Sequence, residues 1–386
     1  MGKLAGRLPI YAALVFCPVN FLAREIRAAP FSPEQFVGAA GCKSSSCHGG
    51  AGEKRSQYLT WVKQDFHFRA YAVLVDARSA RMAETLGLSA AYTSARCTVC
   101  HSPFQAVAPA NLANTASGDE GVSCESCHGA AGSWLRGHTR KDWSYAMRVG
   151  AGMHDLRNFY VRANTCVACH QNLDADLLAA GHPELIFELD GQSVNEPKHW
   201  RDDDPWSGAR AWLVGQAVAL REVSWMLAKS EPPAAEGTGR WNALVWLLAK
   251  ATAHQARLQS IDLPGPNVSK AQFAIMQEQA DLLARQTSAM PWDRDRAATM
   301  LRTLAASEPD FMGSPGAGPD LLFPRASRLV LALDRLARDA AQQAPAPPIT
   351  AALAALFEDV RAQPDFQPAK FAADLTIFRE TIGDAP

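Results

Sequence analysis

The second half of the chain has the hydrophobic pattern of packed helices. After residue 200, apolar residues recur three or four positions apart, which places them on one face of a helix. Ser269 and Gln272 fit a capping box, and Phe273, Met276 and Leu283 then share one face. The spacing recurs in two further sets, Leu329, Leu333 and Leu336, then Leu353, Phe357 and Val360. The pattern predicts some six helices, packed as a bundle or wrapped on the region before them.

Glycine and proline separate these stretches and mark their limits. They accumulate at residues 231–239, 264–266, 311–319 and 344–348, where helices are expected to end. The acidic run 202–204, followed by Pro205, caps and starts the first helix, so we expect an α-helical domain over residues 201–386. Its tryptophans are expected in the core, with a partner-docking face as the alternative: Trp212, Trp225, Trp241 and Trp246. His254 has no motif around it and is expected to be structural.

The first 29 residues have the pattern of an export signal. Lys3 and Arg7 precede an apolar stretch over residues 8–23, and the small residues Ala28 and Ala29 follow. This stretch is short for a membrane span, so we expect a soluble mature protein in the periplasm. The alternative is an uncleaved segment that associates with the membrane, because a large residue would stand three positions before the cut.

Composition excludes several classes of protein. The chain has 386 residues, of which 48% are hydrophobic, as in a soluble globular protein and unlike a disordered or collagenous one. Its formal net charge of −1 gives no reason to expect binding to nucleic acid. The helical half contains no nucleophile elbow, glycine-rich phosphate loop or metalloprotease helix.

Eight of the nine cysteines form four pairs, and a histidine follows each pair directly. The pairs are Cys42/Cys47, Cys97/Cys100, Cys124/Cys127 and Cys166/Cys169, followed by His48, His101, His128 and His170. Histidine is 10 of 386 residues, so four such placements by chance have a probability on the order of one in two million. The ninth cysteine, Cys17, lies in the export signal and is expected to be inert.

Three chemistries could explain such a pattern: disulfides, zinc ribbons and haem attachment. A disulfide across two residues is strained and needs no adjacent histidine. A zinc ribbon needs only four ligands and would not place a histidine beside every second cysteine. In Cys-x-x-Cys-His, both thiols add to haem vinyl groups and the histidine becomes the proximal iron ligand. Haem attachment alone uses all three residues, and it predicts four covalent haem c groups.

The first of the four sequences differs in length. Four residues separate Cys42 from Cys47, so the loop must bulge to bring both thiols to one porphyrin. The other three have the usual two intervening residues.

Five histidines remain in the cysteine-bearing region as candidates for the second axial ligand: His67, His138, His154, His182 and His199. His67 lies in an aromatic-flanked stretch of expected helix, and His138 follows Gly137, which permits close backbone approach. His182 lies among small residues, His199 stands beside Trp200, and His154 has an ordinary polar setting. Methionine is the other common ligand, and Met82, Met147 and Met153 are available. The surplus of histidine favours two histidines on most of the irons.

At these residues the chain resembles the tetrahaem cytochrome c family typified by the electron acceptor of hydroxylamine oxidoreductase. The resemblance covers residues 38–200. It is carried by GCKSSSCHGG at 41–50, GVSCESCHG at 121–129 and AAGHP at 179–183. The resemblance implies three haems with two histidine ligands and a second haem that is five-coordinate.

The resemblance also implies a set of ligand pairs, carried over by order along the chain. His138 would serve the iron of His48, and His67 that of His128. His182 or His199 would serve the iron of His170, and His101 would have no protein partner. The chain departs from the family archetype in its longer first loop, in the additional His154 and in its long helical tail.

Together these observations predict a mainly α protein in three parts. These are a signal peptide (1–29), a tetrahaem cytochrome c domain with few strands (30–200) and an α-helical domain (201–386). We expect a periplasmic electron carrier of a respiratory chain, with unidentified redox proteins as donor and acceptor. One alternative is a reductase or oxidase of a small nitrogen or sulfur compound at the iron of His101. The other is a subunit of a larger assembly that docks through the helical tail. Arg69, Arg136, Arg148 and Arg157 are candidates for pairing with haem propionates.

Overall fold

The computed structural model describes residues 35–200, 204–230, 235–265, 268–313, 319–342, 344–362 and 365–383. The expected export signal lies outside these residues. The described residues form helices and turns, and their one β contact is an isolated bridge between Phe36 and Leu112. The expected mainly α fold class is confirmed, and the few strands expected in the haem region are absent from the described residues.

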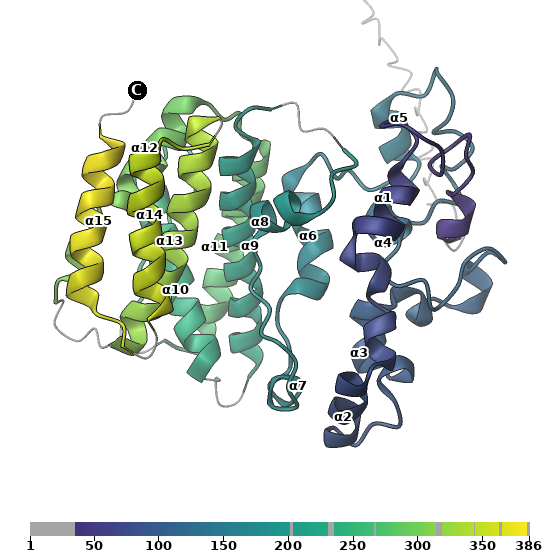
Figure 1. Ribbon diagram of the computed structural model, residues 1–386, viewed down its shortest axis with the longest axis horizontal. Coiled ribbons are helices and arrows are strands. Elements are labelled where there is room, and N and C mark those ends of the chain that lie inside the picture. The colour runs from purple at the N-terminus through teal and green to yellow at the C-terminus, as the bar shows by residue number, and fades with distance from the viewer. Residues whose placement is uncertain are drawn as a thin grey trace, which may run out of the picture.

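Short helices separated by turns make up residues 35–158, which we call the N-terminal region (Figure 1). The α-helices are α1 (Gln57–Gln64), α2 (Ala77–Thr85), α3 (Ala95–His101), α4 (Cys124–His128) and α5 (Tyr145–Gly150). Six 3-10 turns lie between or beside them: Ala39–Gly41, Phe66–Arg69, Ala72–Val75, Ala91–Thr93, Pro103–Ala106 and Pro109–Asn111. The helix expected around His67 is broken at Asp65, whose backbone is extended and whose side chain accepts from the N–H of His67.

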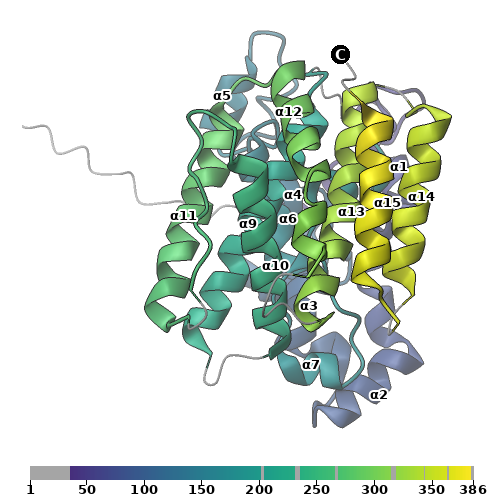
Figure 2. The ribbon, with the colours of Figure 1, turned by 90° about the vertical axis from the view of Figure 1, so that its left-hand side faces the viewer.

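The helices after residue 158 are mostly longer, and all of them except α7 form a bundle. They are α6 (Phe159–His170), α7 (Ala175–Ala179), α8 (Leu189–Asn195), α9 (Ser207–Lys229), α10 (Ala235–Thr252), α11 (Lys270–Ala289), α12 (Arg294–Ala305), the 3-10 turn Glu308–Phe311, α13 (Pro319–Ala341), α14 (Pro347–Arg361) and α15 (Pro368–Ile382). We call α6 and α8 to α15 the helical bundle; Figure 2 shows its long helices side by side. Seven α-helices are described after residue 200, close to the six expected.

The pattern of apolar residues predicts the core of the bundle well. The capping box of Ser269 and Gln272 is present at the start of α11, and Phe273, Met276 and Leu283 are buried. Trp212, Trp241 and Trp246 are buried as expected. The expectation for Trp225 is wrong: its side chain is exposed, and the ammonium of Lys229 lies 4.4 Å from its ring centre.

The helix break expected over residues 231–239 is too long, because α10 already begins at Ala235. Gly237 explains the difference. A β-carbon at this position would lie 3.0 Å from the methyl group of Met226 and 3.2 Å from the side chain of Leu227. The glycine therefore allows α10 to approach α9 closely, and a residue usually read as a helix breaker serves helix packing instead.

Helix α6 belongs to the bundle by packing, although it precedes residue 200. Phe159, Ala163 and Val167 lie in the same apolar core as α9 to α15. At its edge, the hydroxyl of Tyr160 donates to Asp281 of α11 over 2.7 Å. The fourth cysteine–histidine sequence ends this helix, so Cys166, Cys169 and His170 project from a rigid support.

The N-terminal region has a much smaller apolar core, built around Leu74, Ala83 and Ala91. A buried carboxylate fixes part of its backbone. Glu125 accepts the N–H groups of Val37 and Ala131 through one oxygen and that of Gly38 through the other, at 3.0, 2.6 and 2.7 Å. This side chain ties the segment before the first cysteine pair to the third pair, in which it lies.

None of the helices among the described residues is both long enough and apolar enough to cross a lipid bilayer.

Candidate metal centres

The structure brings eight histidines together in four facing pairs. The ring centres are 6.2 Å apart for His48 and His138, 6.3 Å for His101 and His182, 6.3 Å for His128 and His199, and 6.1 Å for His67 and His170. We call these pairs sites 1, 2, 3 and 4, in the order of their cysteine pairs. Each contains the histidine of one cysteine–histidine sequence and one of the candidate second ligands.

The separations match the spacing of two imidazoles on one metal ion. A bond between a first-row metal and an imidazole nitrogen is about 2.0 Å long, and the ring centre lies about 1.2 Å behind that nitrogen, so two imidazoles on opposite sides of one iron have centres about 6.4 Å apart. Direct packing of two imidazole rings does not require this distance to recur four times. The residues therefore fit an iron between the members of each pair.

Hydrogen bonds orient most of these rings for such a role. The Nδ1 atom of His48 faces the side-chain oxygen of Gln57, and that of His67 faces Asp65 Oδ1, both at 3.0 Å. Backbone carbonyls face the Nδ1 atoms of four others: Ala70 for His101, Leu135 for His138, Pro183 for His182 and Pro197 for His199. A proton held on Nδ1 by an acceptor leaves Nε2 as the nitrogen that can bind a metal.

The buried histidines are held in the neutral form that metal ligation needs. Burial lowers the pKa of His128 to about 4, and the neighbouring histidines, led by His199, act in the same direction. Burial likewise lowers the pKa of His101 and of His170. These imidazoles carry no competing proton near neutral pH.

All eight cysteines of the four pairs are free of disulfide bonds. Three pairs lie on the single turns of α3, α4 and the end of α6, where residues three and four apart share one face. The first pair lies on a folded loop: the N–H of Cys47 donates to Ser44, and that of His48 donates back to the carbonyl of Cys42. This fold accommodates the two additional residues between its cysteines.

Effects of cysteines on one another's pKa values show which sites are neighbours. The thiol of Cys124 lowers the pKa of Cys42, and that of Cys169 lowers the pKa of Cys100 to about 7, so site 1 neighbours site 3 and site 2 neighbours site 4. Burial raises the pKa of Cys127, with further effects from Glu196 and Cys166. Sites 3 and 4 are therefore neighbours as well, and the sites form a row in the order 1, 3, 4, 2.

The expected partner of His48 is the one that the structure places there, His138. The structure arranges the other histidines differently from the pairs that the family resemblance implies. The ring of His67 faces His170 rather than His128, and His199 faces His128 rather than His170. These pairs depend on how α6 and the segment that ends at His199 pack against the N-terminal region, which chain order alone does not reveal.

The structure places the ring of His182 opposite His101, the histidine that the resemblance leaves without a protein partner. The turn at Gly181, with a φ of 101°, precedes His182, and the guanidinium of Arg78 donates to the carbonyl of Gly181 over 2.6 Å. This contact ties the loop of His182 to α2, on the side of the molecule where His101 lies.

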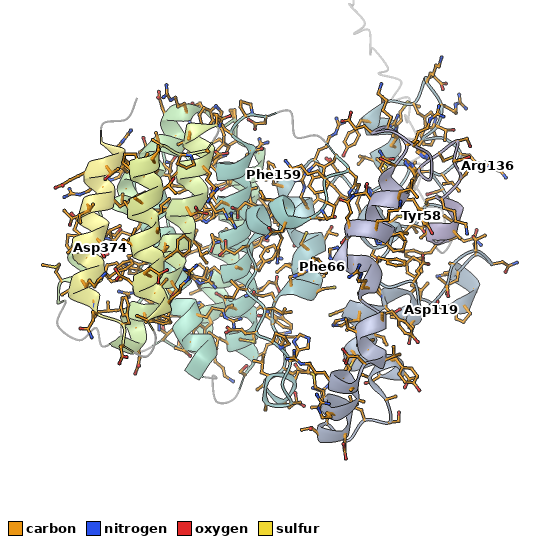
Figure 3. The ribbon with its side chains drawn as sticks, viewed as in Figure 1. Tyr58, Phe66, Asp119, Arg136, Phe159 and Asp374 are labelled. Carbon is orange, nitrogen blue, oxygen red and sulfur yellow. The ribbon has the colours of Figure 1, made fainter. Side chains whose placement is uncertain are left out.

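The remaining histidines have other settings. His154 is exposed, and its Nδ1 atom faces the carbonyl of Cys127 at 2.8 Å, so it lies against the third cysteine–histidine turn outside the four pairs. His254 is exposed on the bundle. Large apolar side chains are exposed next to the pairs, including Phe66, which is 80% exposed and lies on the side of the N-terminal region toward α6 (Figure 3).

Three residues around the pairs carry no motif and were missed by sequence reasoning: Gln57, Asp65 and Glu196. Atoms of Asp65, His67 and Glu196 able to bind a metal all lie within 4.8 Å of one another. A carboxylate two residues before a candidate ligand was the available signal for Asp65. Glu196 comes close to His67 only through the tertiary fold.

Comparison with known proteins gives one match, over part of the chain. Residues 41–129 match the family model described as cytochrome c554 and c-prime. This segment is similar to c-type cytochromes. No curated protein and no solved structure matches the chain.

The matched segment contains the first three cysteine–histidine sequences, and the fourth lies beyond it. The match supports a c-type cytochrome, with haem c as the cofactor, iron as its metal and electron transfer as its general function.

Proposed function

We propose that this protein is a periplasmic electron carrier with four covalently attached haem c groups, each with two histidine ligands. The observation that carries the proposal is the recurrence of a 6.1–6.3 Å separation between histidine rings at all four sites. Each proximal histidine faces one candidate second ligand, and eight free cysteines stand ready for the thioether bonds.

When bound, haem c supplies an iron that exchanges one electron between its ferric and ferrous states. The chain's own residues decide how that iron behaves. Two imidazoles per site favour a low potential and leave no coordination position for a substrate. Two buried donors without a partner among the described residues suit propionate groups: Trp134 Nε1, whose ring centre lies 5.4 Å from that of His138, and Arg148 Nε.

The row of sites has two ends, sites 1 and 2, and we propose that the donor and acceptor proteins meet the carrier there. Site 1 is built entirely within the N-terminal region, whose outer edge carries Arg136 (Figure 3). Site 2 combines α3 with the loop of His182. The partners are proposed to be redox proteins of a respiratory chain, with residues 1–29 acting as the export signal or as a retained membrane anchor.

The competing function, reduction or oxidation of a small molecule at the iron of His101, needs an open coordination position. The ring of His182 opposite His101 argues against such a position. No observation in the structure favours catalysis at another site, and we therefore prefer the electron carrier.

Mass and spin state together test this proposal. The mature protein is expected to have the mass of four attached haems and an entirely low-spin oxidised spectrum that cyanide and nitric oxide leave unchanged. A variant with His182→Ala should convert one haem in four to a high-spin form that binds cyanide. The control His254→Ala alters an exposed histidine of the bundle and should leave the spectrum low-spin.

Two outcomes would contradict the proposal. A mass corresponding to three haems would show that one cysteine pair remains without haem. We would expect this to be Cys42/Cys47, whose loop is longer. A high-spin signal in the unaltered protein would show an open iron and would restore the enzymatic alternative.

A further inference from the structure

His67 of site 4 differs from the other oriented histidines in the group that faces its Nδ1 atom. Asp65 Oδ1 lies 3.0 Å from His67 Nδ1 and 2.9 Å from the backbone nitrogen of His67. The carboxylate is buried at 8% exposure, where its charge acts strongly on its neighbours.

The other oriented histidines face uncharged oxygens. Gln57 presents a side-chain amide to His48, and backbone carbonyls serve His101, His138, His182 and His199. Among the described hydrogen bonds of the four sites, Asp65 is the acceptor that carries a charge. Site 4 is therefore distinguished by chemistry and not only by position.

A charged acceptor changes what a histidine does to its metal. A carboxylate draws the Nδ1 proton toward itself, which makes the opposite nitrogen a stronger electron donor. A stronger donor stabilises ferric iron relative to ferrous iron and so lowers the reduction potential. Glu196, in the same cluster, places a second acidic side chain beside His67.

We propose that Asp65 acts through His67 as a positioning residue and gives site 4 the lowest reduction potential of the four haems. This inference rests on the proposed function. It has a consequence for the row of sites, because site 4 lies inside it, between sites 3 and 2. Electrons would then rest toward the two ends, and exchange between the ends would cross the least favourable site.

The test is a potentiometric titration of the fully loaded protein with Asp65→Asn. Asparagine keeps an oxygen that can accept from both nitrogens of His67, but it removes the charge. The lowest of the four potentials is expected to rise by about 59 mV, which corresponds to a tenfold change in the equilibrium constant of a one-electron reduction. The low-spin electron paramagnetic resonance signal of the same haem should change, and the other three haems should stay as they were.

Three further variants make the test specific. Asp76→Asn removes a carboxylate that caps α2 in the same region, and it should leave all four potentials unchanged. Asp65→Glu keeps the charge and should retain most of the low potential. Gln57→Glu places a carboxylate opposite His48 Nδ1 and should lower the potential of one haem, at site 1.

If Asp65→Asn loses haem, the variant Gln57→Glu still tests the proposal. The inference is overturned if Gln57→Glu lowers no potential, or if a fully loaded Asp65→Asn protein keeps its lowest potential. It is also overturned if Asp76→Asn gives the same shift as Asp65→Asn. Haem count and spin state, measured first on the unaltered protein, separate these failures from failure of the proposed function, which would appear as fewer haems or an open iron.

Discussion

The N-terminal region and the helical bundle differ in the size of the apolar core that they bury. The bundle buries one continuous core, which includes Trp212, Trp241 and Phe371. The apolar cluster around Leu74 in the N-terminal region is small, and Phe66 and Val75 of this region are exposed. A chain segment with so little buried apolar surface needs another source of stability, and the proposed covalent haem groups would supply it.

Sites 2, 3 and 4 connect the N-terminal region to parts of the chain that follow it. Each pairs a histidine from before residue 130 with one from beyond residue 169. Site 4 takes His170 from α6, which the bundle core holds in place. The bundle therefore has a direct role in positioning a metal ligand, in addition to any docking role that its outer surface serves.

Preventing haem attachment should produce the largest difference between the two regions. With all eight cysteines of the pairs changed to serine, we expect residues 35–158 to lose their fold, because their own core is too small. The bundle should keep its helices, because its core contains few residues near the haem sites. Limited proteolysis with mass analysis of the fragments measures this. Equal resistance of both regions to protease would show that the N-terminal region folds without haem, contrary to this prediction.

Removing the charge of Glu125 should destabilise the N-terminal region alone. Glu125→Gln cannot accept all three backbone N–H groups, because one of its side-chain oxygens is replaced by an NH₂ donor. A hydrogen bond to a charged group contributes about 1.5–3 kcal/mol, so we expect a loss of about 3–5 kcal/mol in the free energy of unfolding. Denaturant titration followed at the Soret band, which reports the haem sites, measures this loss.

The matched control for Glu125 is Glu84, an exposed residue of α2 in the same region. Glu84→Gln should change the free energy of unfolding by less than about 0.5 kcal/mol. If the two variants have the same stability, Glu125 does not fix the backbone as we describe.

The smallest expected effect is a dependence of bundle stability on pH. Burial raises the pKa of Asp339 to about 6, above its ordinary value near 3.8, and the charge of Asp204 acts in the same direction. Between these values the folded protein binds more protons than the unfolded chain, so the free energy of unfolding falls as the pH rises from about 4 to about 6. Partial exposure limits the effect to about 1–2 kcal/mol.

Asp339→Asn should remove this part of the pH dependence. The amide oxygen can still accept the N–H of Ala209, which lies 3.0 Å from the carboxylate. Far-UV circular dichroism during thermal unfolding, at pH 4.5 and at pH 7, compares the two proteins. A variant whose melting temperature changes with pH as much as that of the unaltered protein would exclude Asp339 as the source.

Local sequence predicted those features that a few neighbouring residues determine. The capping box at Ser269 formed as expected, because both of its partners lie within one helical turn. Periodicity located the buried faces of α11 and α13, since a helix repeats every 3.6 residues whatever it packs against. Trp225 was placed wrongly for the complementary reason: an aromatic side chain on an otherwise apolar helix does not reveal which neighbour covers it.

The sequence by itself indicated the cofactor chemistry, because two thiols and a histidine within five or seven residues are all that one haem attachment needs. Only the tertiary structure decided which distant histidine faces each of them, because His182 and His199 reach His101 and His128 through the path of a long loop. It also decided that Asp65 and Glu196 meet at His67. Contacts between residues 71 to 131 positions apart depend on the packing of the whole chain, and no local pattern encodes them.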